Sequence, residues 1–97
     1  MFERYLIIQD VEVVFMMNLK EANIGDTFIV LEIHASDATK IFLSTLGIEV
    51  NSEFIIRGDG YLPNTLLIDI DGRIIQLDYI TISQIKGEVV KVKKLIK

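Results

Sequence analysis

The dipeptide Asp71-Gly72, set between two apolar runs, is the local feature that most restricts how this chain can fold. A two-residue hairpin loop of type I′ needs positive φ at both central positions, and Asp-Gly is among the dipeptides that adopt it most readily. The sequence therefore predicts a β-hairpin between residues 65–70 and residues 73–78. The short loop also sets the register, which pairs Ile70 with Arg73, Asp69 with Ile74, Ile68 with Ile75, Leu67 with Gln76, and Leu66 with Leu77.

This register divides the hairpin into an apolar face and a polar face. The apolar face carries Leu66, Ile68, Ile75 and Leu77, and the polar face carries Asp69, Gln76 and Asp78. Antiparallel sheets commonly bury one face and leave the other in water. We therefore interpret these carboxylates as a charged exterior and not as an acid–base pair or a hard-cation site.

Further runs of β-branched and aromatic residues predict strands at 5–17, 27–34, 53–57 and 85–93. In the second of them, Ile29, Leu31 and Ile33 share one face, which leaves Phe28 and Val30 on the other. A short segment, 79–84, precedes the last strand. Several short strands with one brief helix favour a small all-β protein, an antiparallel barrel that is closed or nearly closed.

The one helix is expected between a cap at Ser36 or Asp37 and a stop at Gly47. Its apolar residues follow the helical spacing i, i+3, i+4, i+8, and they are Ala38, Ile41, Phe42 and Leu46. A helix of this length is marginal alone. We therefore expect this stripe to lie on the sheet.

Composition excludes several classes of protein. A chain of 97 residues supports one core, and with no cysteine it has no disulfide, thiolate nucleophile or Cys-ligated metal site. The longest apolar run, Val13 to Met17, is five residues, against the roughly 20 needed to span a bilayer. No signal peptide is recognisable at the start. We expect a cytoplasmic protein that does not insert into a membrane.

The charge distribution argues against nucleic acid as a partner. Lys91, Lys93, Lys94 and Lys97 supply four of the ten basic residues, which leaves six against fourteen acidic residues elsewhere. An acidic body repels phosphate. The lysines alternate with valines, and we interpret this segment as a solvated edge strand.

The order of these features resembles the FeoA family, small SH3-like cytosolic proteins associated with the ferrous iron transporter FeoB. The resemblance covers roughly residues 18–87, and its most specific piece is the Leu-x-x-Leu-Gly-Ile segment from Leu43 to Ile48. A strand, a loop with Pro63 and the Gly72 hairpin follow at the family spacing. The chain departs from the pattern where the family has a Pro-Gly turn, because Val50 and Asn51 stand there; asparagine tolerates the left-handed conformation that the glycine would serve.

The resemblance implies an SH3-like barrel with the helix over one mouth. Residues 18–90 would form it, residues 1–17 would be an N-terminal extension that could add a strand, and residues 91–97 would be the lysine-rich end of the last strand. The paired methionines Met16 and Met17 also allow residues 1–16 to be an addition upstream of a complete domain. The module is also similar to the C-terminal domain of DtxR-type metal-dependent repressors, but no helix-turn-helix is found.

The sequence offers little for catalysis or for a resident metal. His34 is the single histidine, and Glu32 projects from the same strand face, so the pair could hold a divalent ion weakly. A dedicated site needs three or four ligands. We therefore expect no catalytic residue, no cofactor and no built metal site, with transition-metal binding limited to this pair.

Apolar residues exceed what one face of a small barrel needs, and Phe28, Val30, Leu67 and Ile74 belong to this surplus. Exposed apolar patches usually mark partner sites. A homodimer through the N-terminal or the last strand would cover the surplus, and so would residues 1–16 within the monomer. The resemblance points to a cytosolic part of the FeoB-type transporter as the partner. The candidate contacts are Lys40, Leu43, Leu46, Tyr61, Leu62 and Pro63, with Asn64 completing the loop.

Two functions from different classes follow from the resemblance. The first is a non-enzymatic accessory protein of ferrous iron transport that acts through protein–protein interaction. The second is a metal-sensing or peptide-binding regulatory module like the repressor C-terminal domain. Tight metal binding that depends on His34 would separate the second from the first.

Overall fold

The computed structural model describes residues 11–13 and 16–92, with side chains over 16–90. The predicted strand at 5–17 and the lysine-rich end 91–97 therefore lie partly outside the described residues. The elements are β1 Val11–Val13, β2 Met17–Asn18, a 3₁₀ turn η1 Leu19–Glu21, β3 Thr27–Ile33, α2 Asp37–Thr45, β4 Glu53–Asp59, β5 Thr65–Ile70, β6 Arg73–Asp78, α3 Tyr79–Ser83 and β7 Ile85–Val92.

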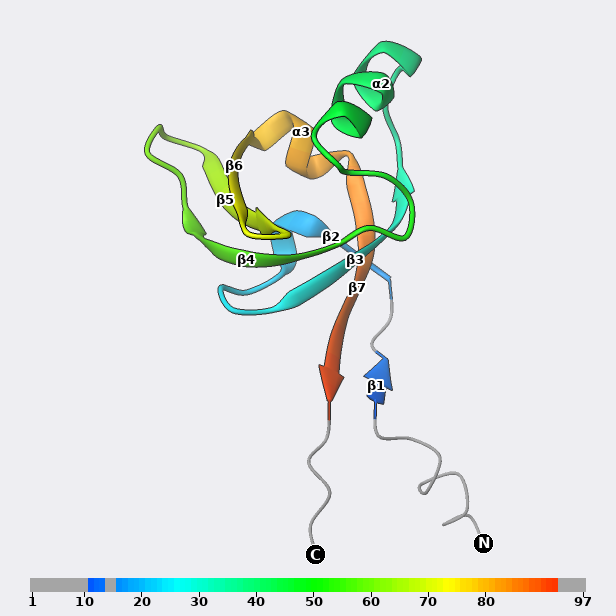
Figure 1. Cartoon of the computed structure of the whole chain (residues 1–97), viewed down its shortest axis with the longest axis vertical. Helices are drawn as coiled ribbons and strands as arrows, with labels where there is room; N and C mark the ends of the chain where they lie inside the picture. Colours follow the sequence, from blue (N-terminus) through cyan, green and yellow to red (C-terminus); the bar gives the residue numbers. More distant parts are fainter. Residues whose placement is uncertain (1–10, 14–15, 93–97) are drawn as a thin grey trace, which may run out of the picture.

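All the strand pairs are antiparallel and join one strongly curved sheet in the order β1-β7-β3-β4-β5-β6, with β2 also paired to β7 (Figure 1). The predicted small all-β architecture is confirmed. The sheet does not close, because within the described chain β6 has no partner beyond β5. A barrel with one open side is therefore the correct description.

The hairpin forms as the sequence predicts. All five expected pairs, from Ile70 with Arg73 to Leu66 with Leu77, are present. The φ angles are 52° at Asp71 and 85° at Gly72, as a type I′ turn requires. Asn51 stands where the family has the glycine of its Pro-Gly turn, and its φ is 79°. It therefore adopts the left-handed conformation that the glycine would serve.

The core fills the concave side of the sheet. Phe28 and Phe54 are cross-strand partners whose rings stack at a centroid distance of 5.7 Å. Phe28 and Val30 are fully buried, so assigning them to the exposed surplus was wrong. The rest of the core consists of Leu19, Leu43, Ile48, Ile56, Ile68, Ile70, Leu77, Ile82, Ile85 and Val89.

The helix α2 begins and ends where predicted but presents a different face. Ser36 is its N-cap, and the Ser36 Oγ accepts a hydrogen bond of 3.2 Å from the Thr39 N–H. The expected stripe does not lie on the sheet: Ile41 and Phe42 are 66% and 57% exposed, and Ala38 is exposed as well. Leu43 is instead the residue of α2 that is buried. In Figure 1 the helix stands away from the curved sheet.

A second helix, α3, occupies the segment left unassigned before the last strand. Asp78 caps it by accepting a 2.8 Å hydrogen bond from the Thr81 N–H. It packs against η1, β5, β6 and β7, and buries Ile82. Of the two helices it makes the more extensive packing contacts with the sheet.

At the end of the molecule opposite α2, the end of β7 extends out of the barrel and β1 lies beside it, antiparallel to it (Figure 1). Its register places Glu12 opposite Lys91. None of the helices in the described part of the chain is long and apolar enough to cross a membrane.

Candidate functional site

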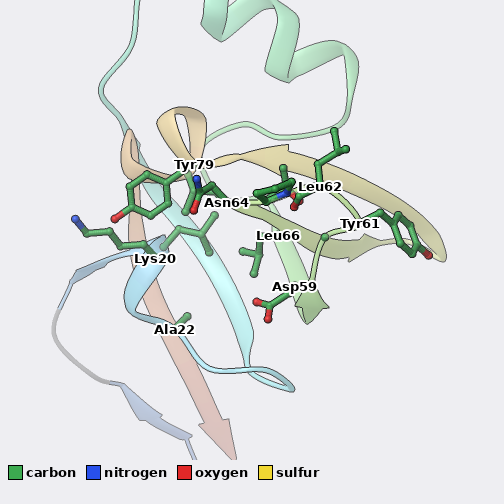
Figure 2. A pocket seen from close by; sticks show the side chains of 13 residues that line it. Lys20, Ala22, Asp59, Tyr61, Leu62, Asn64, Leu66 and Tyr79 are labelled. Carbon is green, nitrogen blue, oxygen red and sulfur yellow. The ribbon is translucent and has the colours of Figure 1, made fainter.

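An open hollow lies between η1, α3 and the loop that joins β4 to β5 (Figure 2). We call it the tyrosine groove, and its volume is about 540 Å³. It is lined by Leu19, Lys20, Ala22, Asp59, Gly60, Tyr61, Leu62, Pro63, Asn64, Thr65, Leu66, Tyr79 and Ile82.

The outer wall of the tyrosine groove is a loop held in one shape by hydrogen bonds. The Gly60 N–H donates to the Thr65 carbonyl at 2.9 Å, and the Thr65 hydroxyl donates to the Leu62 carbonyl at 2.6 Å. From β6, the Gln76 Oε1 accepts the Tyr61 N–H at 2.7 Å. A Cβ at Gly60 would overlap the Thr65 and Gln76 side chains, so the loop needs glycine there.

This rigid loop presents apolar side chains to solvent. Tyr61 is 87% exposed and Leu62 is 61% exposed. Ordering such a loop in advance lowers the entropic cost of binding a partner. Large exposed apolar side chains around a hollow are typical of a protein-docking surface.

The floor of the tyrosine groove is apolar and its rim is charged. Leu19 and Ile82 lie buried beneath it, and Leu66 is half-buried at its centre. Lys20 and Asp59 carry opposite charges on different sides of Leu66 (Figure 2). The Lys20 Nζ lies 5.8 Å from the centre of the Tyr79 ring, within the range of a cation–π contact.

The structure divides the six candidate contact residues into two groups. Tyr61, Leu62 and Pro63 lie together in the tyrosine groove. Lys40 is exposed on α2 and lines a different hollow. Leu43 is fully buried, and Leu46 is half-buried against the core, so neither offers a free apolar surface to a partner.

That second hollow, of about 530 Å³, we call the histidine hollow; it is lined by Glu32, Ile33, His34, Lys40, Ile48, Glu49 and Val50. The His34 Nε2 lies 2.7 Å from the Glu32 Oε1, and both side chains are about half exposed. Glu49 accepts a 2.7 Å hydrogen bond from the Ser44 hydroxyl. Within the described residues no group of three or more His, Asp or Glu side chains could hold a metal ion.

Two carboxylates of the hairpin, Asp69 and Asp78, have a lowered pKa, which favours their ionised form. Hydrogen bonds from the Arg57 guanidinium and from the Gly72 N–H lower the pKa of Asp69, although partial desolvation opposes them. Hydrogen bonds from the Thr81 side chain and backbone lower the pKa of Asp78. A general acid near neutral pH needs a raised pKa, so neither carboxyl is arranged for that work.

Comparison with known proteins now gives the family. The model of the FeoA domain matches residues 17–89, which is most of the chain. The chain belongs to the FeoA domain family. No curated protein sequence matches it. The resemblance carried by the Leu43–Ile48 segment and the hairpin is therefore confirmed.

Solved structures show the fold. A crystal structure of an iron uptake regulatory protein, FeoA, has a TM-score of 0.70 at 14% identity, and the match covers 78% of this chain and 99% of that one. The FeoA protein from Chlorobium tepidum has a TM-score of 0.68 at 19% identity, over 75% of this chain and 70% of that one. The SH3-like fold expected from the resemblance is thus confirmed.

A manganese-dependent transcriptional repressor shares the fold as well, with a TM-score of 0.66 at 19% identity over 76% of this chain and 41% of that one. The protein ScaR, solved with bound Zn²⁺, has a TM-score of 0.66 at 24% identity; the match covers 74% of this chain and 36% of that one. The likeness extends over about a third of ScaR. Similarity to repressor domains of the DtxR type is thereby shown for the fold.

Sequence reasoning missed several residues of these surfaces. Lys20, Asp59 and Tyr79 come from three separate elements, and no spacing along the chain brings them together. The helical spacing of Ile41 and Phe42 predicts a buried stripe, which is wrong for these two residues. The signal that could have shown which face of the helix is buried is the pair of apolar residues Leu43 and Ile48, on either side of the helix stop at Gly47.

Proposed function

We propose that this chain is a non-enzymatic accessory protein of ferrous iron transport, which binds a cytosolic part of a FeoB-type transporter through the tyrosine groove. The match of residues 17–89 to the FeoA domain carries the proposal. The tyrosine groove supports the proposal, because its loop exposes Tyr61 and Leu62 beside an apolar floor.

The shape of the tyrosine groove suits an extended or helical segment of a partner protein. An apolar side chain of the partner would be buried on the floor of the groove at Leu66. Lys20 and Asp59, on either side of Leu66, would favour partner residues of opposite charge. No bond is made or broken in this role. Binding alone would support or regulate iron uptake.

The test uses this protein and the purified cytosolic region of the FeoB-type transporter of the same cell. We expect calorimetry to measure a 1:1 complex, and the variant Leu62→Glu to weaken it at least about tenfold, because the charge loses hydration at the interface. Ile74→Glu is the matched control, since Ile74 is 55% exposed and lies outside the groove. An absent complex, together with normal ferrous iron uptake after deletion of the gene, would disprove the proposal.

A second candidate function is a metal-sensing or peptide-binding regulatory module. The likeness to ScaR and the His34–Glu32 pair favour it. Calorimetric titration with ferrous, manganese and zinc ions tests it: tight stoichiometric binding that is lost in His34→Ala supports the sensor. Weak binding unaffected by that variant supports the transport accessory.

A further inference from the structure

The chain contains two Asp-Gly dipeptides, Asp59-Gly60 and Asp71-Gly72. In such a dipeptide the backbone nitrogen of the glycine can attack the aspartyl Cγ, because glycine has no side chain to hinder the approach. The nitrogen loses its proton, the carboxyl loses its hydroxyl as water, and the new C–N bond closes a succinimide ring. When water then opens the ring at the α-carbonyl, an isoaspartate is left, in which the backbone runs through Cβ and Cγ.

The fold restrains the first of these dipeptides through its backbone. Asp59 is the last residue of β4 and pairs with Leu66 of β5. The Gly60 N–H donates to the Thr65 carbonyl at 2.9 Å. The backbone at Gly60 is also closely packed, because a Cβ there would overlap the Thr65 and Gln76 side chains. Strand pairing and packing therefore both oppose ring closure at Asp59-Gly60.

The second dipeptide is open to the reaction on every side but one. Asp71 and Gly72 are exposed and lie outside the cross-strand pairs of the hairpin, and a Cβ at Gly72 would meet nothing within 4 Å. Their restraint is a side chain: the Gly72 N–H donates to the Asp69 Oδ1 at 2.9 Å. The Arg57 guanidinium holds the other oxygen of Asp69 at 2.8 Å. One hydrogen bond to a carboxylate thus does for Gly72 what strand pairing and packing do for Gly60.

The hydrogen bond from Gly72 to Asp69 opposes ring closure directly. To reach the Asp71 Cγ, the Gly72 nitrogen must leave the type I′ turn by rotation about the Asp71 Cα–C bond, and it must give up its proton. The hydrogen bond to Asp69 is broken in both steps. Asp69 is also a poor base for that proton, because the hydrogen bond from Arg57, above all, lowers the pKa of its carboxyl. The carboxylate therefore restrains the nitrogen and does not activate it.

We propose that Asp71-Gly72 is the site at which this chain forms isoaspartate, and that the Asp69 carboxylate sets the rate by holding the Gly72 N–H. Isoaspartate adds a carbon to the backbone of the turn, and a two-residue loop fixes the register of its strands only at its own length. On β6, Gln76 accepts the Tyr61 N–H in the wall of the tyrosine groove, so the change would reach that wall. The inference goes beyond the proposed function and does not depend on it.

Incubation of the folded full chain at neutral pH tests the choice of site, with Asp59-Gly60 as a control inside the same molecule. Peptide mapping, with fragmentation that distinguishes isoaspartate from aspartate, measures the rate at each dipeptide. We expect isoaspartate to accumulate several times faster at Asp71 than at Asp59 in the folded chain, and at similar rates in urea, where the fold is lost. Equal rates in the folded chain, or the same difference in urea, would overturn the proposal.

Two variants test the role of Asp69. Asp69→Ala removes the acceptor of the Gly72 N–H and should speed isoaspartate formation at Asp71 about two- to tenfold, the effect of one hydrogen bond, with no change at Asp59. Arg57→Ala is the matched control, because it removes the ion pair and leaves the acceptor in place. Far-ultraviolet circular dichroism checks that both variants are folded. Equal acceleration in the two variants, or an unchanged or slower reaction in Asp69→Ala, would overturn the role of the carboxylate.

Discussion

The Ile48 N–H donates a 2.9 Å hydrogen bond to the Leu43 carbonyl across the end of α2. The Gly47 N–H donates to the Ser44 carbonyl at 3.0 Å, and Gly47 has φ 92°. These two bonds define a Schellman motif, whose characteristic hydrophobic contact joins the residues that flank it. Leu43 and Ile48 are both fully buried. The helix stop therefore fixes which face of α2 meets the core.

Leu43→Ala should be strongly destabilising. It removes most of a buried side chain at the point where the helix contacts the core, and such changes cost about 2–5 kcal/mol. Urea unfolding followed by circular dichroism measures the loss. Phe42→Ala is the matched control, because Phe42 is exposed, and should change the free energy of unfolding by less than about 0.5 kcal/mol. Equal losses in the two variants would mean that the stripe at Ala38, Ile41 and Phe42 packs inward after all.

The contrast between the hairpin and the helix shows what the sequence could predict. The hairpin is specified locally, because Asp71-Gly72 sets the turn and the turn sets every pair. The helix ends are local as well, and Ser36 and Gly47 were found from their types. Which face of α2 is buried depends on where the rest of the chain lies, and periodicity alone chose the wrong one.

Asn51 tests the departure from the family pattern. Its φ of 79° lies in the left-handed region, while its N–H donates to the Val30 carbonyl at 2.7 Å. Asn51→Ala should cost about 1–2 kcal/mol, since alanine lacks the short polar side chain that eases this conformation. Asn51→Gly should be neutral or slightly stabilising. Thermal unfolding of both variants measures the difference, and an alanine variant as stable as the glycine variant would contradict it.

Strand alternation has a related limit. It showed that Phe28 and Val30 share a face, but alternation does not say which face the core takes when both are apolar. In β3 the other face, with Ile29 and Leu31, is half-buried as well. The tyrosine groove lay beyond sequence reasoning for a further reason: its charged rim comes from η1 and the end of β4, elements that only the fold brings together.

Gly87 is required by a close approach between strands. A Cβ at this position would overlap the Ile29 carbonyl oxygen and the Phe28 ring. Backbone cannot move aside as a flexible side chain can, so Gly87→Ala should destabilise by at least about 2 kcal/mol. Glu88→Ala, on the adjacent residue of β7, is the control and should cost less than about 1 kcal/mol. Chemical denaturation of both proteins checks the prediction, which an unchanged Gly87→Ala midpoint would refute.

Stability should fall in acid because of two carboxylates. The pKa of Asp69 is lowered by its hydrogen bond from Arg57, and the pKa of Asp78 by those from Thr81. A lowered pKa means that the folded protein binds fewer protons than the unfolded chain. The stabilisation is therefore complete above the ordinary carboxyl pKa, near 3.8, and is lost as the pH falls through the lower folded values.

Urea midpoints measured between about pH 2 and about pH 7 test this dependence. The wild type should hold its midpoint down to about pH 4 and lose it below. In Asp69→Asn, the part of the fall of the urea midpoint that depends on Arg57 should be absent. The fall that remains should come largely from Asp78. The double variant Asp69→Asn, Asp78→Asn should show the flattest profile, with a lower midpoint at neutral pH. If its midpoint fell in acid as steeply as that of the wild type, other groups would carry the pH dependence.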